Sequence, residues 1–199
     1  MILYINACVR EESRTKRLAD CLLSKMVGEA VELDLGRIVF LEVNEAFLQK
    51  RDRLIAAGEF GNPMFDLARQ FAEADQILIA APYWDLSFPA VLKQYFEQIN
   101  VSGITFKYTS DGYPAGLCKA ETLYYVMTAG GMYVPEEFGF GYIKALANNF
   151  YGIRDIRLLK AVGLDIDGAD VEGIMQESMR TSVEDFEEQF LGREESGKG

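Results

Sequence analysis

Short apolar runs recur along the chain and are separated by longer amphipathic segments. The clearest run covers residues 77–81 and stops at Pro82. Its apolar and β-branched residues are typical of a strand that is buried on both faces of a parallel sheet. Residues 31–35 alternate instead between polar and apolar positions, as expected for a strand with one exposed face. In all, the pattern predicts five strands, at residues 2–8, 31–35, 77–81, 123–127 and 156–162.

The amphipathic segments between these runs have the 3.6-residue period of helices. After the first strand, a helix is predicted to follow Thr15 and to end at Gly28. After the third strand, Ser87 is a good N-cap, and Pro89 suits the first turn of a helix that ends near Val101. Further helices are predicted at residues 44–57, 64–74, 142–150 and 169–191.

Strands that alternate with helices in this order predict an α/β fold built on a doubly wound parallel sheet. No repeat, low-complexity segment or linker divides the sequence, so residues 1–191 are predicted to form a single domain. Glycines and Pro114 mark residues 102–116 as an excursion outside the sheet. The polar residues 192–199 are predicted to be a disordered tail.

Composition narrows the class of protein. The 199 residues are 49% hydrophobic and 26% charged, as in soluble globular proteins. We find no apolar run long enough to span a bilayer and no signal peptide, so a cytoplasmic location without a membrane partner is the default expectation. The formal net charge of −11 disfavours binding to nucleic acid.

The sequence contains no histidine, which excludes Ser-His-Asp and Cys-His catalysis and the commonest zinc sites. Its three cysteines, Cys8, Cys21 and Cys118, are too widely spaced for a metal or iron–sulfur motif and are interpreted as buried free thiols. No metal site is therefore predicted. Any chemistry has to use carboxylates, tyrosines, backbone dipoles or a bound cofactor.

Residues 9–15 form the first candidate loop, at the start of the first helix. Arg10, Arg14, Lys16 and Arg17 place four positive charges within eight residues. A helix N-terminus already carries positive character, so cations there favour a bound anion. The hydroxyls of Ser13 and Thr15, with Arg10 or Arg14, could hold a phosphate monoester. Alternatively, Ser13 only caps the helix and the basic side chains point into water.

Two further loops follow the third and fourth strands, and the carboxyl ends of parallel strands meet at one edge of the sheet. The first carries the flat side chains of Tyr83 and Trp84. The second contains Gly130 and Gly131, whose backbone N–H groups can approach a ligand closely, and Thr128 adds a hydroxyl. Together the loops favour a flat heteroaromatic ligand, although a glycine pair also suits an ordinary tight turn.

Several of these segments resemble the flavodoxin-like quinone reductases and azoreductases. The resemblance rests on Pro82 followed by residues 87–93, on residues 103–117, on residues 128–131 and on the Ser13-Arg14-Thr15 triplet. It implies a five-stranded sheet of order 2-1-3-4-5 with helices on both faces and FMN as the cofactor. It also implies a homodimer with the active site at its interface. The implied substrates, used in turn in a ping-pong reaction, are NADH or NADPH and a quinone, azo compound or other flat aromatic acceptor.

In this interpretation the flavin carries the chemistry, and no side chain is assigned as catalytic. Tyr83, Trp84 and Tyr133 are predicted to shape the substrate pocket. Asp85 and Tyr83 depart from the family pattern, which favours Asn and a slim apolar residue at those positions. The predicted cofactor-binding residues are Arg10, Ser13, Arg14, Thr15, Pro82, Tyr83, Trp84, Asp85, Leu86, Thr128, Ala129, Gly130 and Gly131.

Two other functions fit the same sequence. A flavodoxin-like electron carrier would have the fold and the flavin but no small-molecule substrate, and it would be monomeric without turnover of NADH. A regulatory or scaffold protein would retain the fold and stay colourless when FMN is added.

Overall fold

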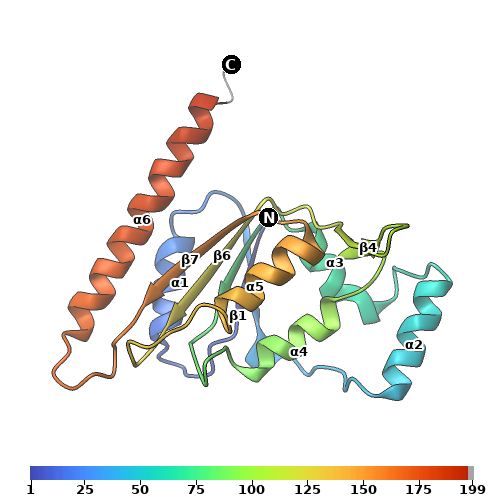
Figure 1. The fold of residues 1–199 in the computed structure, drawn as a ribbon, viewed down its shortest axis with the longest axis horizontal. Coiled ribbons are helices and arrows are strands. Elements are labelled where there is room, and N and C mark those ends of the chain that lie inside the picture. The colour runs from blue at the N-terminus through green and yellow to red at the C-terminus, as the bar shows by residue number, and fades with distance from the viewer. Residues whose placement is uncertain (197–199) are drawn as a thin grey trace.

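The computed structural model describes the backbone of residues 1–196 and the side chains of residues 1–186. A five-stranded parallel sheet runs through the molecule in the order β2-β1-β3-β6-β7 (Figure 1). This confirms the predicted α/β doubly wound fold and its 2-1-3-4-5 order. The strands are β1 (Ile2–Asn6), β2 (Ala30–Asp34), β3 (Gln76–Ala80), β6 (Thr122–Thr128) and β7 (Asp155–Ala161).

Helices cover both faces of the sheet. On one face lie α1 (Arg14–Leu23) and α6 (Val171–Ser196), and on the other lie α3 (Asp66–Glu73), α4 (Ala90–Ile99) and α5 (Phe140–Leu146) (Figure 1). Successive residues of a strand point to opposite faces, so each strand contributes to two cores. Leu3 and Ile5 pack beneath α3, α4 and α5, whereas Ile2 and Tyr4 pack beneath α1 and α6.

The segment between β2 and β3 reaches away from the sheet. It contains the 3-10 turn Leu35–Arg37, the helix α2 (Glu45–Ala56) and a second 3-10 turn, Pro63–Phe65, before α3. The Asn44 side chain caps α2 by accepting a hydrogen bond from the N–H of Phe47 at 3.0 Å. The prediction of a helix at residues 44–57 is thereby confirmed.

Residues 102–116 form a small antiparallel hairpin outside the main sheet, with strands β4 (Phe106–Tyr108) and β5 (Pro114–Gly116). Gly116 packs directly against the backbone of Tyr151, where a Cβ atom would come within 2.3 Å of backbone atoms. This close approach requires glycine. The contacted segment is the π-helical turn Ala147–Tyr151, which continues α5, so the helix predicted at residues 142–150 is shifted and partly non-α.

Three predicted boundaries are wrong. α1 ends at Leu23, because the chain then continues in tighter turns through Met26 to Gly28, which has a φ of 134°. Ser87 does not cap α4, whose N-cap is Pro89. α6 runs to Ser196, so residues 192–196 extend the helix instead of forming the predicted disordered tail, and residues 197–199 lie outside the described residues.

Within residues 1–196, no helix is both long and apolar enough to cross a membrane.

Candidate functional site

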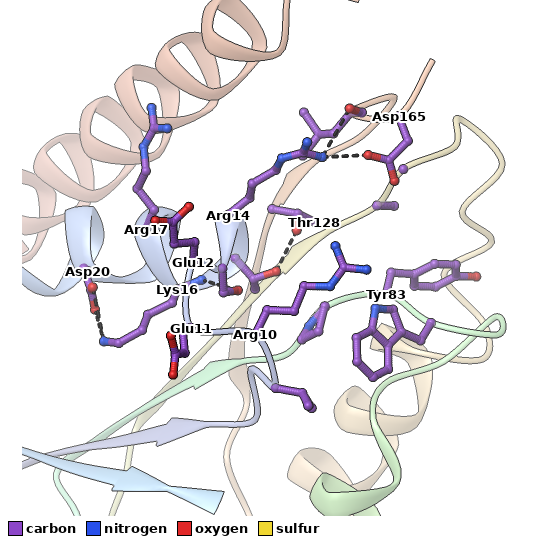
Figure 2. Close-up of a pocket in the computed structure, with 18 residues that line it drawn as sticks. Arg10, Glu11, Glu12, Arg14, Lys16, Arg17, Asp20, Tyr83, Thr128 and Asp165 are labelled. Atoms are coloured by element: carbon purple, nitrogen blue, oxygen red, sulfur yellow. Dashed lines mark hydrogen bonds and ion pairs between the residues drawn. The ribbon is translucent and has the colours of Figure 1, made fainter. Parts of the chain in front are cut away.

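A cavity of about 850 Å³ opens at the carboxyl edge of the sheet (Figure 2). The three predicted loops meet there because Asn6, Ala80 and Val126 lie side by side in the parallel register. The lining includes Arg10, Ser13, Arg14, Thr15, Pro82, Tyr83, Trp84, Thr128, Ala129 and Gly130. The predicted site residues Asp85, Leu86, Gly131 and Tyr133 lie outside the lining.

A buried pair of hydroxyls joins the first loop to the third. Thr15 and Thr128 are only 1% and 8% exposed, and their Oγ1 atoms lie 2.6 Å apart. One hydroxyl has to donate to the other, so the pair retains a single proton for a ligand. This contact fixes the N-terminus of α1 against the end of β6.

Ser13 is the N-cap of α1, and its Oγ accepts a hydrogen bond from the N–H of Lys16 at 3.2 Å. Its hydroxyl proton can be donated to a second acceptor, either a ligand or the neighbouring Cys8 sulfur. The N–H groups of Arg14 and Thr15 form no hydrogen bond with the described part of the chain. The cavity therefore meets the positive end of a helix and several unpaired donors, which is a suitable place for an anion.

The four cations near this loop have different environments. Carboxylates pair with three of them: Arg14 with Asp165 (2.8 Å), Lys16 with Asp20 one turn along the same helix (3.0 Å), and Arg17 with Glu172 of α6. Arg10 forms no ion pair or hydrogen bond with the described residues, and Figure 2 shows it directed into the cavity. The sequence predicted cations that either bind a phosphate or point into water. It did not indicate that three of them are paired with carboxylates of the protein itself.

The loop after β3 contains a tight turn with an unusual backbone. Trp84 and Ser87 exchange two backbone hydrogen bonds, of 3.0 and 2.7 Å. Between them Asp85 and Leu86 have φ values of 51° and 66°, in the left-handed region that residues with a Cβ rarely adopt. Such residues cost of order 1–2 kcal/mol each. Their N–H groups donate to no described acceptor.

Tyr83 anchors this turn to its surroundings. Its N–H donates to the carbonyl of Thr128 at 2.9 Å, and its hydroxyl donates to the carbonyl of Pro135 at 3.4 Å. Partial burial is the main cause that raises the pKa of Tyr83, and the nearby Tyr133 and Glu137 raise it further. The Tyr83 hydroxyl therefore stays protonated. Tyr133 is thus close to the cavity although it does not line it.

A fourth loop, residues 163–165 after β7, was missed by the sequence analysis. Its backbone N–H groups donate to the carbonyls of Ala129, Gly130 and Gly131 at 3.0–3.2 Å. The carbonyls of residues 129–131 are therefore occupied by this loop, whereas the N–H groups of Gly130 and Gly131 have no described acceptor. The rule that the loops after parallel strands share one edge applied equally to this loop and could have found it.

The thiols show no sign of activation. All three cysteines are free, but only Cys8 is buried, whereas Cys21 and Cys118 are half-buried, which corrects the sequence interpretation. Burial raises the pKa of Cys8 to about 11 and that of Cys118 to about 12, so both remain protonated near neutral pH.

The strand order reverses between β1 and β3, and ligands of doubly wound proteins bind at this switch point. The fold and the cavity therefore define an α/β protein that binds a ligand at the carboxyl edge of its sheet. The sequence matches the protein family described as "Flavodoxin-like fold" over residues 1–185. The chain belongs to this family.

The chain is similar to named proteins over almost its whole length. It is 35% identical to an FMN-dependent NADH:quinone oxidoreductase of Clostridium perfringens (strain ATCC 13124), covering 92% of this chain and 96% of the relative. The identity to a protein of the same name from Coprothermobacter proteolyticus is 36%, with 95% and 98% covered. The crystal structure of azoreductase from Bacillus anthracis superposes with a TM-score of 0.80 at 23% identity, covering 92% and 96% of the two chains.

Proposed function

We propose that the protein is an FMN-dependent oxidoreductase that takes electrons from NADH or NADPH and passes them to quinones or azo compounds. The observation that carries this proposal is the cavity at the switch point, which is lined by the unpaired backbone N–H groups of Arg14 and Thr15 from the first loop and of Gly130 from the glycine loop. Unpaired donors that line a cavity favour a ligand with several hydrogen-bond acceptors. The names of the two bacterial relatives support FMN, NADH and a quinone.

The α1 end of the cavity fits the phosphate of FMN. The Ser13 hydroxyl and the N–H groups of Arg14 and Thr15 supply donors, and Arg10 supplies an unpaired positive charge. The guanidinium of Arg14, which was the other predicted phosphate ligand, is occupied by Asp165. We therefore assign the main electrostatic contact to Arg10.

The other two loops fit the flavin ring. The N–H groups of Gly130 and Gly131 would donate to the polar edge of the ring, and those of Asp85 and Leu86 would donate from the strained turn. When bound, FMN would supply the hydride and electron transfer, which explains how a protein without histidine could catalyse this reaction. Tyr83 and Trp84 would form the wall on which a nicotinamide or a flat acceptor stacks in turn.

Exposed apolar side chains support the proposed homodimer. Large apolar groups remain in water on the turn after β3, on residues 132–138 and on the hairpin: Trp84, Leu86, Met132, Tyr133, Phe138, Tyr108 and Tyr113. Tyr83 connects the first two of these segments through its bond to Pro135. A second copy that covered the turn after β3 and residues 132–138 would also complete the cavity wall. Sedimentation equilibrium tests this, and an active monomer at assay concentrations would contradict it.

The decisive test of function is a visible spectrum of the purified protein after addition of FMN. We expect a bound flavin spectrum that is bleached anaerobically by NADH and restored by a quinone or an azo dye. Denaturation of the loaded protein should release FMN, and exclusive release of FAD would contradict the single-phosphate site. Bleaching by NADH without reoxidation by these acceptors would favour an electron carrier, and a colourless protein would favour a scaffold. A cytoplasmic location stays a prediction.

A further inference from the structure

The ion pair between Arg14 and Asp165 is placed at the phosphate end of the cavity. Nη1 of Arg14 donates to Oδ1 of Asp165 at 2.8 Å and to the carbonyl of Leu164 at 3.2 Å (Figure 2). Both residues line the cavity, and the pair joins the first turn of α1 to the loop after β7. The Arg14 guanidinium is therefore held by the loop after β7.

The position of Asp165 is set independently of Arg14. Its N–H donates to the carbonyl of Gly130 at 3.0 Å, and the neighbouring bonds from Gly163 and Leu164 fix the same loop. Its Oδ2 lies only 2.2 Å from the position that a Cβ atom on Gly130 would occupy. The carboxylate is thus held against the glycine loop and presents its other oxygen to Arg14.

We propose that Asp165 is a specificity-determining residue that acts as an internal substitute for a phosphate. It occupies the Arg14 guanidinium and leaves Arg10 as the cation available to FMN. This proposal rests on the proposed flavin site. Its consequence is that the wild-type protein discriminates less between FMN and riboflavin than its four cations would suggest, because three of them are already neutralised.

An exposed ion pair contributes little net stability, and here 43% of the Arg14 side chain and 71% of the Asp165 side chain are exposed. Removing the negative charge should therefore free Arg14 without unfolding the loop, which the backbone bonds of residues 163–165 still hold. Asp165→Asn keeps the size of the side chain and removes only the charge. We expect FMN to bind about fivefold more tightly to this variant, the upper end for an exposed ion pair.

The experiment is a fluorescence titration of the apoprotein with FMN and, separately, with riboflavin. The expected result is tighter FMN binding by Asp165→Asn and unchanged riboflavin binding. Asp167→Asn is the matched control, because it removes the same charge from the same connection between β7 and α6, but Asp167 does not line the cavity and has no described partner. It should leave both affinities unchanged within about twofold.

Two further variants test the route through Arg14. Arg14→Gln alone leaves the Asp165 carboxylate unpaired at the phosphate end and should weaken FMN binding, whereas Arg14→Gln combined with Asp165→Asn should bind FMN as the wild type does, without the gain. If the double variant still binds FMN more tightly than the wild type, Asp165 acts by direct repulsion of the phosphate. If Asp165→Asn changes riboflavin affinity equally, Asp165 only positions Gly130. Either result overturns the proposal. A wild-type protein that binds neither flavin would instead overturn the proposed function, and this inference with it. Flavin binding with no effect of Asp165→Asn would overturn the inference alone.

Discussion

Replacement of Arg10 tests which of the clustered cations binds the phosphate. Arg10 alone has no partner among the described residues, whereas Arg17, which also lines the cavity, is paired with Glu172. A hydrogen bond between charged groups contributes about 1.5–3 kcal/mol. Because Arg10 is exposed, we expect the lower end. Arg10→Gln should therefore weaken FMN binding by about 1.5 kcal/mol, or roughly tenfold.

The assay is the fluorescence titration with both flavins, repeated at low and high salt. Riboflavin has no phosphate, so its affinity for Arg10→Gln should match that for the wild type. The difference in FMN affinity should shrink at high salt, since the contact is solvent-accessible and screened. Arg17→Gln is the matched control and should change FMN affinity by less than about twofold, because its charge is already neutralised. Equal losses in the two variants, or an equal loss for riboflavin, would refute the assignment of the phosphate to Arg10.

Three other predictions concern the proposed stacking wall at Trp84, the hydrogen bond between Thr15 and Thr128, and the stability of the protein in acid. Trp84→Ala should retain FMN but lose about 1–3 kcal/mol of transition-state binding in the half-reaction with the acceptor, with little effect on the half-reaction with NADH. Stopped-flow traces in which both half-reactions are slowed equally would contradict this prediction. Thr15→Val leaves the buried Thr128 hydroxyl unpaired and should lower the free energy of unfolding in urea by about 1–3 kcal/mol, whereas the double valine variant should recover part of that loss. Hydrogen bonds from Lys119, and then from the N-terminal amine, lower the pKa of Asp75 to about 2, below its value in the unfolded chain. The free energy of unfolding that this shift contributes should be fully present above about pH 4 and should disappear as the pH falls through 2. Asp75→Asn should remove this part of the pH dependence of unfolding.

The hydrophobic pattern predicted the five strands and most helices correctly, because alternation and the 3.6-residue period are local properties of the sequence. The boundaries were less certain. Ser87 has the chemistry of an N-cap, but its backbone is used in the turn with Trp84, and Pro89 starts α4 instead. Competing uses of one residue cannot be ranked from its type alone.

The sequence by itself determined the doubly wound sheet, the edge at which the loops meet and many of the residues that line the cavity, although not Leu164 and Asp165. The tertiary structure decided how those residues are used. Asp165 lies 151 positions from Arg14, and Glu172 lies 155 positions from Arg17, so no local pattern could show that these cations were already paired. The directions of the free N–H groups at Gly130 and Gly131 were likewise set by a loop from another strand. Local periodicity specifies which segments become strands and helices, whereas charge pairing and hydrogen-bond direction depend on neighbours that only folding brings together.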